Sequence, residues 1–361
     1  MKNLVRKDIL KVMPYKAGKP IEETKRELGL KSVIKLASNE NPLGPSPRAV
    51  AAMEKILRET NRYPDSQSFY LKKKLAQMLK VGPQNIVTGN GSDELIDVII
   101  KTLVEKDENI VTADTTFLEY EIISRVNGRE VLRVPLKNFA FDLENIRKKI
   151  NRKTKLVFIA NPNNPTGTYV NETQVASFIS SLPERVVVVF DEAYDTFIDT
   201  NDFPEVLSYV KRGNVIVMKT FSKAYGLAGL RVGYLVADPD LVSYMERVRQ
   251  PFNVNMIAQA GALAALGDTD FLAKTKDCVL QGKAYLYRQL DTLGIRYIPS
   301  VTNFILIDVG KNGLDVFKNM LKCGVIVRDM QQYGLTNFIR VTIGTAAENK
   351  RFIEVFKKVL L

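Results

Sequence analysis

The chain has 361 residues, of which 45% are hydrophobic and 25% are charged, as is ordinary for a soluble globular enzyme. It contains no histidine, which excludes histidine as a catalytic base, and with only two cysteines a structural zinc site is not expected. The formal net charge of +12 suggests a nucleic-acid partner or an attraction for anionic small molecules. Because the basic residues are spread along the chain in helix-like patterns typical of solvated faces, we expect no nucleic-acid partner. Because the chain has no histidine and only two cysteines, we expect no metal.

The apolar runs and the cysteines indicate the cellular compartment of the protein. The longest apolar runs, such as residues 186–190, are far too short to cross a bilayer. The first ten residues, MKNLVRKDIL, carry scattered charges and lack the apolar core of a secretory signal. Cys278 and Cys323 do not indicate a disulfide framework, so a reducing compartment fits. We therefore expect a cytoplasmic protein with no membrane partner.

From the N-terminus, an arm rich in proline and glycine precedes the first clear helix, expected at about residues 48–58. Strand-like and helix-like segments then alternate, with helices expected at 94–104 and 172–181 among others. Such alternation predicts an α/β fold with a largely parallel sheet covered by helices on both faces. The expected strands are 86–88, 109–112, 130–134, 156–160, 186–190, 215–219 and 234–237.

After an apolar helical stretch at 255–266 the pattern changes. Strands are expected at 303–308, 324–328 and 338–343, followed by a final helix, which predicts a smaller α+β lobe. We divide the chain into an N-terminal arm (1–45) that joins this lobe, a large domain (46–266) and a small C-terminal domain (267–361). In open α/β sheets ligands bind beyond the carboxyl ends of the strands, so polar residues at strand ends are the candidate site.

The strand in NVIVMKTFSK leads directly into Ser222 and Lys223. A lysine at a strand end can point into a cleft, and when it is desolvated its amine can attack a carbonyl. Alone, Lys223 has the alternative interpretation of an exposed surface lysine. Arg231, eight residues later, can return to the same cleft and bind a phosphate with its forked donors.

Two further strand ends carry polar residues. Asp191 follows the continuous apolar run VVVVF, which is typical of a buried central strand, although a helix N-cap is an alternative role for it. Tyr194 lies three residues later. Asn164 lies in the turn NPNNPTG, which without other information is a plain loop.

The segment IVTGNGSDELIDVII predicts a strand, a turn and a helix that begins near Ser92. Free N–H groups at a helix start form an anion site, so Gly91, Ser92 and Asp93 are candidates to bind a phosphate. A serine-capped helix with acids in its first turn is the alternative. Phe117, after another strand, is either a site residue or an ordinary core phenylalanine.

The string TFSKAYGLAGLRVG at 220–233 resembles the cofactor-attachment signature of the fold-type I, class II aminotransferases. The resemblance implies the PLP-transferase fold, with pyridoxal 5′-phosphate (PLP) attached to Lys223. It also implies that Asp191 pairs with the pyridine nitrogen and that Tyr194 and Asn164 contact the phenolate oxygen.

By the same resemblance, Phe117 stacks on the cofactor ring, and Thr115 stands where relatives often have a proline. The cofactor phosphate is then bound by the main chain of the Ser92 turn together with two side chains. The phosphate-binding residues implied are Gly91, Ser92, Asp93, Ser222 and Arg231.

Four other segments resemble histidinol-phosphate aminotransferases: PYKAGKPIEE, LASNENPLGPSP, NRYPD, and the pair GVIVRDM and NFIRVTIGT. The resemblance implies that Arg340 binds the substrate α-carboxylate and that Arg328 helps to bind a substrate phosphate. It further implies a homodimer, in which Tyr63 and the N-terminal arm reach the partner's site. The first two segments supply the remaining substrate-side candidates, Tyr15, Asn39, Glu40 and Asn41.

The implied reaction transfers an amino group between L-histidinol phosphate and 2-oxoglutarate, giving imidazole-acetol phosphate and glutamate in histidine biosynthesis, with Lys223 as general base. Alternatives that share Lys223, Asp191 and Asn164 are an aromatic or broad-specificity aminotransferase and a decarboxylase of a phosphorylated amino acid. A transcription regulator with an aminotransferase-like domain is a further alternative. Residues 1–45 are too short and proline-rich for the helix-turn-helix domain that it would need.

Overall fold

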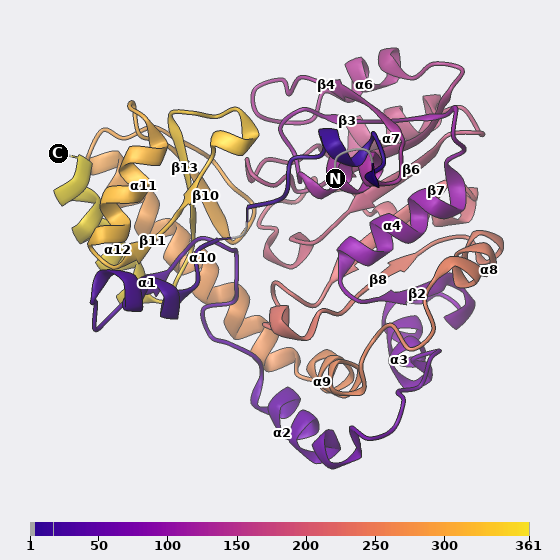
Figure 1. The fold of residues 1–361 in the computed structure, drawn as a ribbon, viewed down its shortest axis with the longest axis horizontal. Helices are drawn as coiled ribbons and strands as arrows, with labels where there is room; N and C mark the ends of the chain where they lie inside the picture. Colours follow the sequence, from indigo (N-terminus) through magenta and orange to yellow (C-terminus); the bar gives the residue numbers. More distant parts are fainter. Residues whose placement is uncertain (1–3, 17, 361) are drawn as a thin grey trace.

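A seven-stranded sheet forms the centre of the larger lobe in the computed structural model, which describes residues 4–16 and 18–360 (Figure 1). The strand order is β2-β8-β7-β6-β5-β3-β4. Strand β8 is antiparallel to both of its neighbours, and every other pair in this sheet is parallel. The strands are β2 (Ile86–Gly89), β3 (Asn109–Ala113), β4 (Glu130–Val134), β5 (Thr154–Ala160), β6 (Val187–Asp191), β7 (Val215–Thr220) and β8 (Gly233–Val236).

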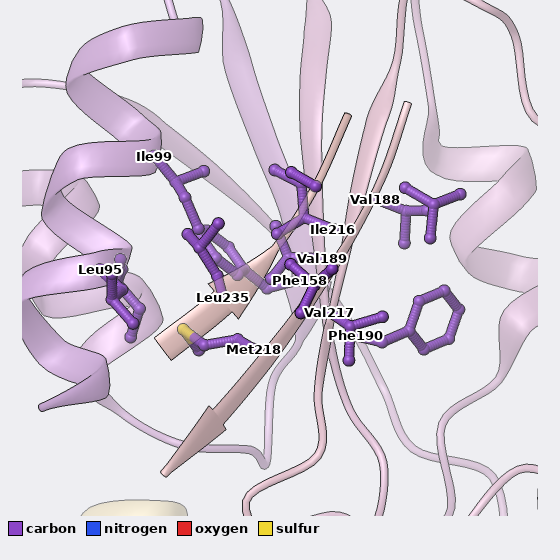
Figure 2. Packing of buried hydrophobic residues seen from close by; sticks show 14 of the residues in the cluster. Leu95, Ile99, Phe158, Val188, Val189, Phe190, Ile216, Val217, Met218 and Leu235 are labelled. Carbon is purple, nitrogen blue, oxygen red and sulfur yellow. The ribbon is translucent and has the colours of Figure 1, made fainter. Parts of the chain in front are cut away.

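Helices cover both faces of this sheet. Figure 2 shows Leu95 and Ile99 of one helix against one face, while Val188 and Phe190 of β6 point to the opposite face. These four side chains are fully buried, and each such burial stabilises the fold by about 1.5–3 kcal/mol. The helices of this lobe are α2 (Pro47–Ile56), α3 (Phe69–Leu79), α4 (Ser92–Leu103), α5 (Glu119–Val126), α6 (Leu143–Lys149), α7 (Glu172–Ser181), α8 (Pro239–Val248) and α9 (Met256–Leu266).

The smaller lobe contains an antiparallel sheet in the order β12-β13-β10-β9. The N-terminal segment joins this lobe, because β1 (Ile34–Lys35) pairs in parallel with β11 (Val325–Ile326). The long helix α10 (Thr269–Thr292) extends from the large lobe into the small one (Figure 1). The other elements here are α1 (Ile21–Leu28), β9 (Tyr297–Ile298), β10 (Phe304–Asp308), α11 (Gly313–Lys322), β12 (Arg328–Asp329), β13 (Phe338–Thr342) and α12 (Ala346–Leu360).

The predicted fold class is confirmed: an α/β chain with a mostly parallel central sheet and a smaller α+β lobe. The prediction of a single strand at 324–328 was wrong, because two short strands, β11 and β12, lie there instead. Helix α1 was not predicted, and for α3 only a helix-like pattern around Lys72, without bounds, was expected. Among residues 4–16 and 18–360, no helix is both long and apolar enough to span a membrane. Short 3-10 helices lie at Ile9–Lys11, Leu57–Glu59, Pro83–Asn85, Asp195–Phe197, Val206–Arg212, Ala228–Leu230 and Gln331–Tyr333.

Candidate active site

A cavity of about 380 Å³ lies at the carboxyl ends of three parallel strands. Ala160, Asp191 and Thr220 are the last residues of β5, β6 and β7, and all three line it. This is the edge of the sheet where the sequence predicted a ligand site. The structure brings the following sequence-predicted residues together around the cavity: Tyr15, Asn39, Glu40, Ser92, Asp93, Phe117, Asn164, Asp191, Tyr194, Ser222, Lys223, Arg231 and Arg340.

The Asp191 carboxylate is a buried acceptor at the end of β6, with 5% of the residue exposed. Tyr120 donates a hydrogen bond of 2.7 Å from its hydroxyl to Oδ2, and the main-chain N–H of Ala193 donates one of 3.1 Å to Oδ1. Burial raises the pKa of Asp191 to about 6, although these two hydrogen bonds favour the charged form. A ligand that donates a positively charged N–H to Asp191 would therefore be strongly favoured.

Lys223 and Tyr194 both line the cavity and lie close to each other. The Lys223 ammonium is 5.7 Å from the centre of the Tyr194 ring. Among the described residues, Lys223 makes no salt bridge, so its amine is available to a ligand. The buried Tyr194 hydroxyl accepts a hydrogen bond of 2.9 Å from Asn39 Nδ2, which ties it to the N-terminal segment.

Hydrogen-bond donors for an anion gather where α4 begins. Ser92 is the first residue of this helix, so its free main-chain N–H groups and the helix dipole favour negative charge. Arg231 Nη2 binds Asp93 Oδ2 at 3.0 Å, and its Nη1 lies 3.5 Å from Ser222 Oγ. Gly91 has φ of +82°, and a Cβ there would lie 2.5 Å from Arg231 Nη2. Any other residue would be strained at this φ and would displace the Arg231 guanidinium, so the turn favours glycine.

Arg340, on β13 of the small lobe, also lines the cavity, and only 4% of it is exposed. Its Nη1 donates to Asn164 Oδ1 and its Nη2 donates to the Ala37 carbonyl at 2.9 Å. Its Nε is buried with no partner among the described residues. A buried unpaired donor is costly, which suggests that a ligand satisfies it. Because Asn164 Oδ1 is used by Arg340, Asn164 offers its amide N–H groups to a ligand.

Four sequence-predicted residues do not line the cavity. Gly91 shapes the turn as described above. Asn41 instead donates to the Ala224 carbonyl at 2.9 Å and to Thr275 Oγ1, so it fixes the chain next to Lys223. The others are Arg328 and Tyr63.

Arg328 lies behind Tyr15, with its guanidinium carbon 5.3 Å from the Tyr15 ring centre. It is buried, and its Nη2 donates to Gln332 Oε1 at 3.2 Å. Tyr63 is 82% exposed, and its ring stacks on Phe252 with 4.7 Å between ring centres.

Eight lining residues were missed by the sequence analysis, among them the polar Ser38, Glu119 and Tyr120. Burial, and then the charge of Asp93, raise the pKa of Glu119 to about 7. Burial, and then the charge of Asp191, raise the pKa of Tyr120, so its phenol remains a donor. The spacing of Phe117 and Tyr120 gave no helical signal, because α5 begins only at Glu119 and Phe117 precedes it.

Comparison with known proteins gives matches over nearly the full length. The family described as aminotransferase class I and II matches residues 31–356. Histidinol-phosphate aminotransferase from Moorella thermoacetica is 46% identical over 98% of this chain and 92% of its own. Histidinol-phosphate aminotransferase 1 from Nitrosococcus oceani is 46% identical over 96% of this chain and 94% of its own.

A solved structure agrees with the sequence matches. The histidinol-phosphate aminotransferase from Sinorhizobium meliloti, in complex with pyridoxal-5′-phosphate, superposes with a TM-score of 0.91 at 29% identity. The superposition covers 99% of this chain and 97% of that one. These matches confirm the resemblance that the motifs indicated. The chain belongs to the aminotransferase class I and II family.

Proposed function

We propose that this chain is a PLP-dependent transaminase that transfers an amino group between L-histidinol phosphate and 2-oxoglutarate in histidine biosynthesis. The observation that carries the proposal is that one cavity brings three features together. They are Lys223, which makes no salt bridge among the described residues, the buried Asp191, and the hydrogen-bond donors around Ser92. Relatives named histidinol-phosphate aminotransferase, 46% identical over nearly the whole chain, support the substrate.

The cavity fits PLP in size and in chemistry. Its volume of about 380 Å³ lies in the range of sites that enclose small ligands. The raised pKa of Asp191, about 6, fits a cofactor that brings its own cationic ring nitrogen to that carboxylate. The helix N-terminus at Ser92, together with Ser222 and Arg231, fits a phosphate group.

The bound cofactor supplies an electron sink for the charge that develops when a proton leaves the substrate α-carbon. Asp191 would hold the proton on the ring nitrogen, and Tyr120 would keep the carboxylate oriented through its 2.7 Å hydrogen bond. Phe117 would pack against the ring. Tyr194 and Asn164 would donate hydrogen bonds to the phenolate oxygen.

The phosphate would be bound mainly by the turn before α4. The main-chain N–H groups of Ser92 and Asp93 would donate to it, with the side chains of Ser222 and Arg231. The Gly91 N–H would join them by leaving its 2.8 Å hydrogen bond to the Gly89 carbonyl. Arg231 is already held by Asp93, so little side-chain freedom would be lost on binding.

Lys223 has two roles in the proposal. Its amine would hold the cofactor covalently, and once free of it would act as general base. In that second role Lys223 would take the proton from the substrate α-carbon and move it to the cofactor C4′ atom. The half-reaction with 2-oxoglutarate uses the same residues in reverse.

The substrate side is formed by the small lobe and the N-terminal segment. Arg340, whose Nε lacks a partner among the described residues, would bind the α-carboxylate of glutamate. Arg328 would help to bind the phosphate of histidinol phosphate, with its guanidinium held beside Tyr15. Asn39 and Glu40 line this side, and Asn41 supports it from behind.

We also propose a cytoplasmic homodimer in which Tyr63 and the N-terminal arm reach the partner's site. Large exposed apolar side chains support a subunit interface: Leu57, Tyr63, Phe69, Tyr70 and Phe252. The free cysteines Cys278 and Cys323 fit a reducing compartment. We propose the domain limits 1–45, 46–266 and 267–361, since one hydrophobic core draws on residues between 49 and 266.

Single-turnover kinetics test the substrate. The PLP-loaded enzyme is mixed with histidinol phosphate, phenylalanine or tyrosine, and the loss of cofactor absorbance is followed. The proposal predicts the highest kcat/KM for histidinol phosphate, with glutamate formed when 2-oxoglutarate is added. Equal or faster reaction with phenylalanine would favour an aromatic aminotransferase, and release of CO₂ from a phosphorylated amino acid would favour a decarboxylase.

A further inference from the structure

Asn253, in the segment between α8 and α9, uses both ends of its carboxamide. Its Oδ1 accepts a hydrogen bond of 2.7 Å from Arg249 Nη1. Its Nδ2 donates to Glu94 Oε2 at 2.7 Å and to the Thr88 carbonyl at 3.1 Å. One side chain therefore joins the α8–α9 segment to β2 and to the first turn of α4.

These contacts hold the turn that precedes α4 on both sides. Glu94 Oε2 also accepts the main-chain N–H of Asn90 at 2.5 Å. Thr88 lies just before this turn, and Asn90 lies within it. The same turn carries Gly91 and Ser92, whose main-chain N–H groups are the proposed phosphate donors.

Arg249, on the other side of Asn253, is itself firmly held. Only 7% of it is exposed, and its Nε and Nη2 donate to Glu246 Oε2 at 2.9 and 2.7 Å. Glu246 also binds Lys72 Nζ at 2.7 Å, so charged groups of α3 and α8 form one network. Such buried networks are rigid when every member is satisfied and costly when one member is removed.

We propose that Asn253 is a positioning residue that fixes the orientation of the phosphate-binding turn before α4. This inference rests on the proposed PLP site. Only a side chain with one acceptor and one N–H donor group satisfies Arg249, Glu94 and the Thr88 carbonyl together. An aspartate at 253 would still accept from Arg249. It would also place a carboxylate against Glu94 and against the Thr88 carbonyl, with no proton between them.

The position of Phe252 supports a fixed geometry at this point. It precedes Asn253, has φ of +59° without being glycine, and stacks on Tyr63 with an angle of 22° between the rings. Left-handed backbone is costly for a phenylalanine and persists only when the surroundings fix it. The contacts of Asn253 on three segments provide that constraint.

The test compares PLP with pyridoxal, which lacks the phosphate, by titrating the cofactor-free full-length chain. Asn253→Asp should raise the Kd of PLP by about tenfold or more, as expected when buried hydrogen bonds around the turn are lost. The Kd of pyridoxal should rise by less than about threefold, because the ring contacts do not depend on the turn. Asn312→Asp is the matched control, since the exposed Asn312 caps α11 by accepting from the Leu314 N–H and aspartate caps equally well.

A double variant provides a rescue. In Glu94→Gln with Asn253→Asp, the amide donor moves to residue 94 while the net charge stays that of the natural chain. This exchange should recover most of the lost PLP affinity, although the Thr88 carbonyl stays without its donor. If Asn253→Asp does not fold, Asn253→Ala gives the same comparison, with a smaller but still PLP-selective loss.

An unchanged Kd for PLP, or an equal loss for PLP and pyridoxal, would overturn the positioning role. Absence of rescue in the double variant would also count against it. A natural chain that binds no PLP would refute the proposed function itself, whereas PLP binding that is indifferent to Asn253 refutes only this inference.

Discussion

The Asp191→Asn substitution should change how the stability of the cofactor-free protein depends on pH. Burial raises the pKa of Asp191 from 3.8 to about 6, so the folded chain binds its proton more tightly than the unfolded chain. The stability that this carboxyl contributes is complete below about pH 4 and is lost as the pH rises through about 6. The full effect of the shift is about 3 kcal/mol, of which about 1.5 kcal/mol is lost between pH 5 and pH 8.

Urea denaturation of both chains without cofactor, at pH 5 and at pH 8, measures this effect. The stability of Asp191→Asn relative to the natural chain should increase by about 1.5 kcal/mol between the two pH values. The exposed Asp240, replaced by asparagine, controls for the loss of one carboxylate from the chain as a whole. If the stability difference between the two chains is the same at both pH values, or changes in the opposite direction, the claim that the cavity raises the pKa of Asp191 is refuted.

Other predictions concern binding and catalysis. Tyr120→Phe removes the 2.7 Å hydrogen bond to Asp191 and should raise the Kd of PLP by about tenfold, measured by titration. Arg328→Ala should lower kcat/KM for histidinol phosphate by about 10–100-fold and that for phenylalanine far less; equal losses would argue against a phosphate role. Mixing inactive Tyr63→Phe and Lys223→Ala subunits should restore activity in the hybrid dimer, and no recovery despite subunit exchange would count against shared sites.

The parallel sheet and the strand-end residues were predictable from the sequence for a physical reason. Strands buried on both faces are continuous apolar runs, so VVVVF located β6 and, with it, Asp191. Lys223, three residues beyond the end of β7, and the turn before α4 followed from the same pattern. The local sequence was therefore enough to predict which residues lie at the edge of the sheet that forms the cavity.

Helix α1, which was not predicted, and helix α3, whose bounds were not predicted, show where local signals are weak or misleading. Helix α3 begins after Ser68, whose side chain makes no cap hydrogen bond; Asp65 accepts from the Phe69 N–H instead. It ends at Lys80, which adopts a left-handed conformation that usually marks a glycine. Helix α1 did have a signal, the left-handed Gly29 after its last residue, but the proline-rich context favoured an irregular arm.

The remaining site features depend on contacts between segments far apart in the sequence. The hydrogen bond from Tyr120 to Asp191 joins two elements that only the folded sheet brings together. The place of Arg328 behind Tyr15, outside the cavity lining, results from packing of the arm against β12. No spacing or periodicity within either segment specifies such a contact.

Reduction of the PLP-loaded enzyme with borohydride, followed by peptide mapping, tests the central claim most directly. The account predicts that the cofactor becomes fixed to the peptide that contains Lys223, and that Lys223→Ala abolishes the label. A label on any other lysine, or an unchanged label in Lys223→Ala, would contradict it.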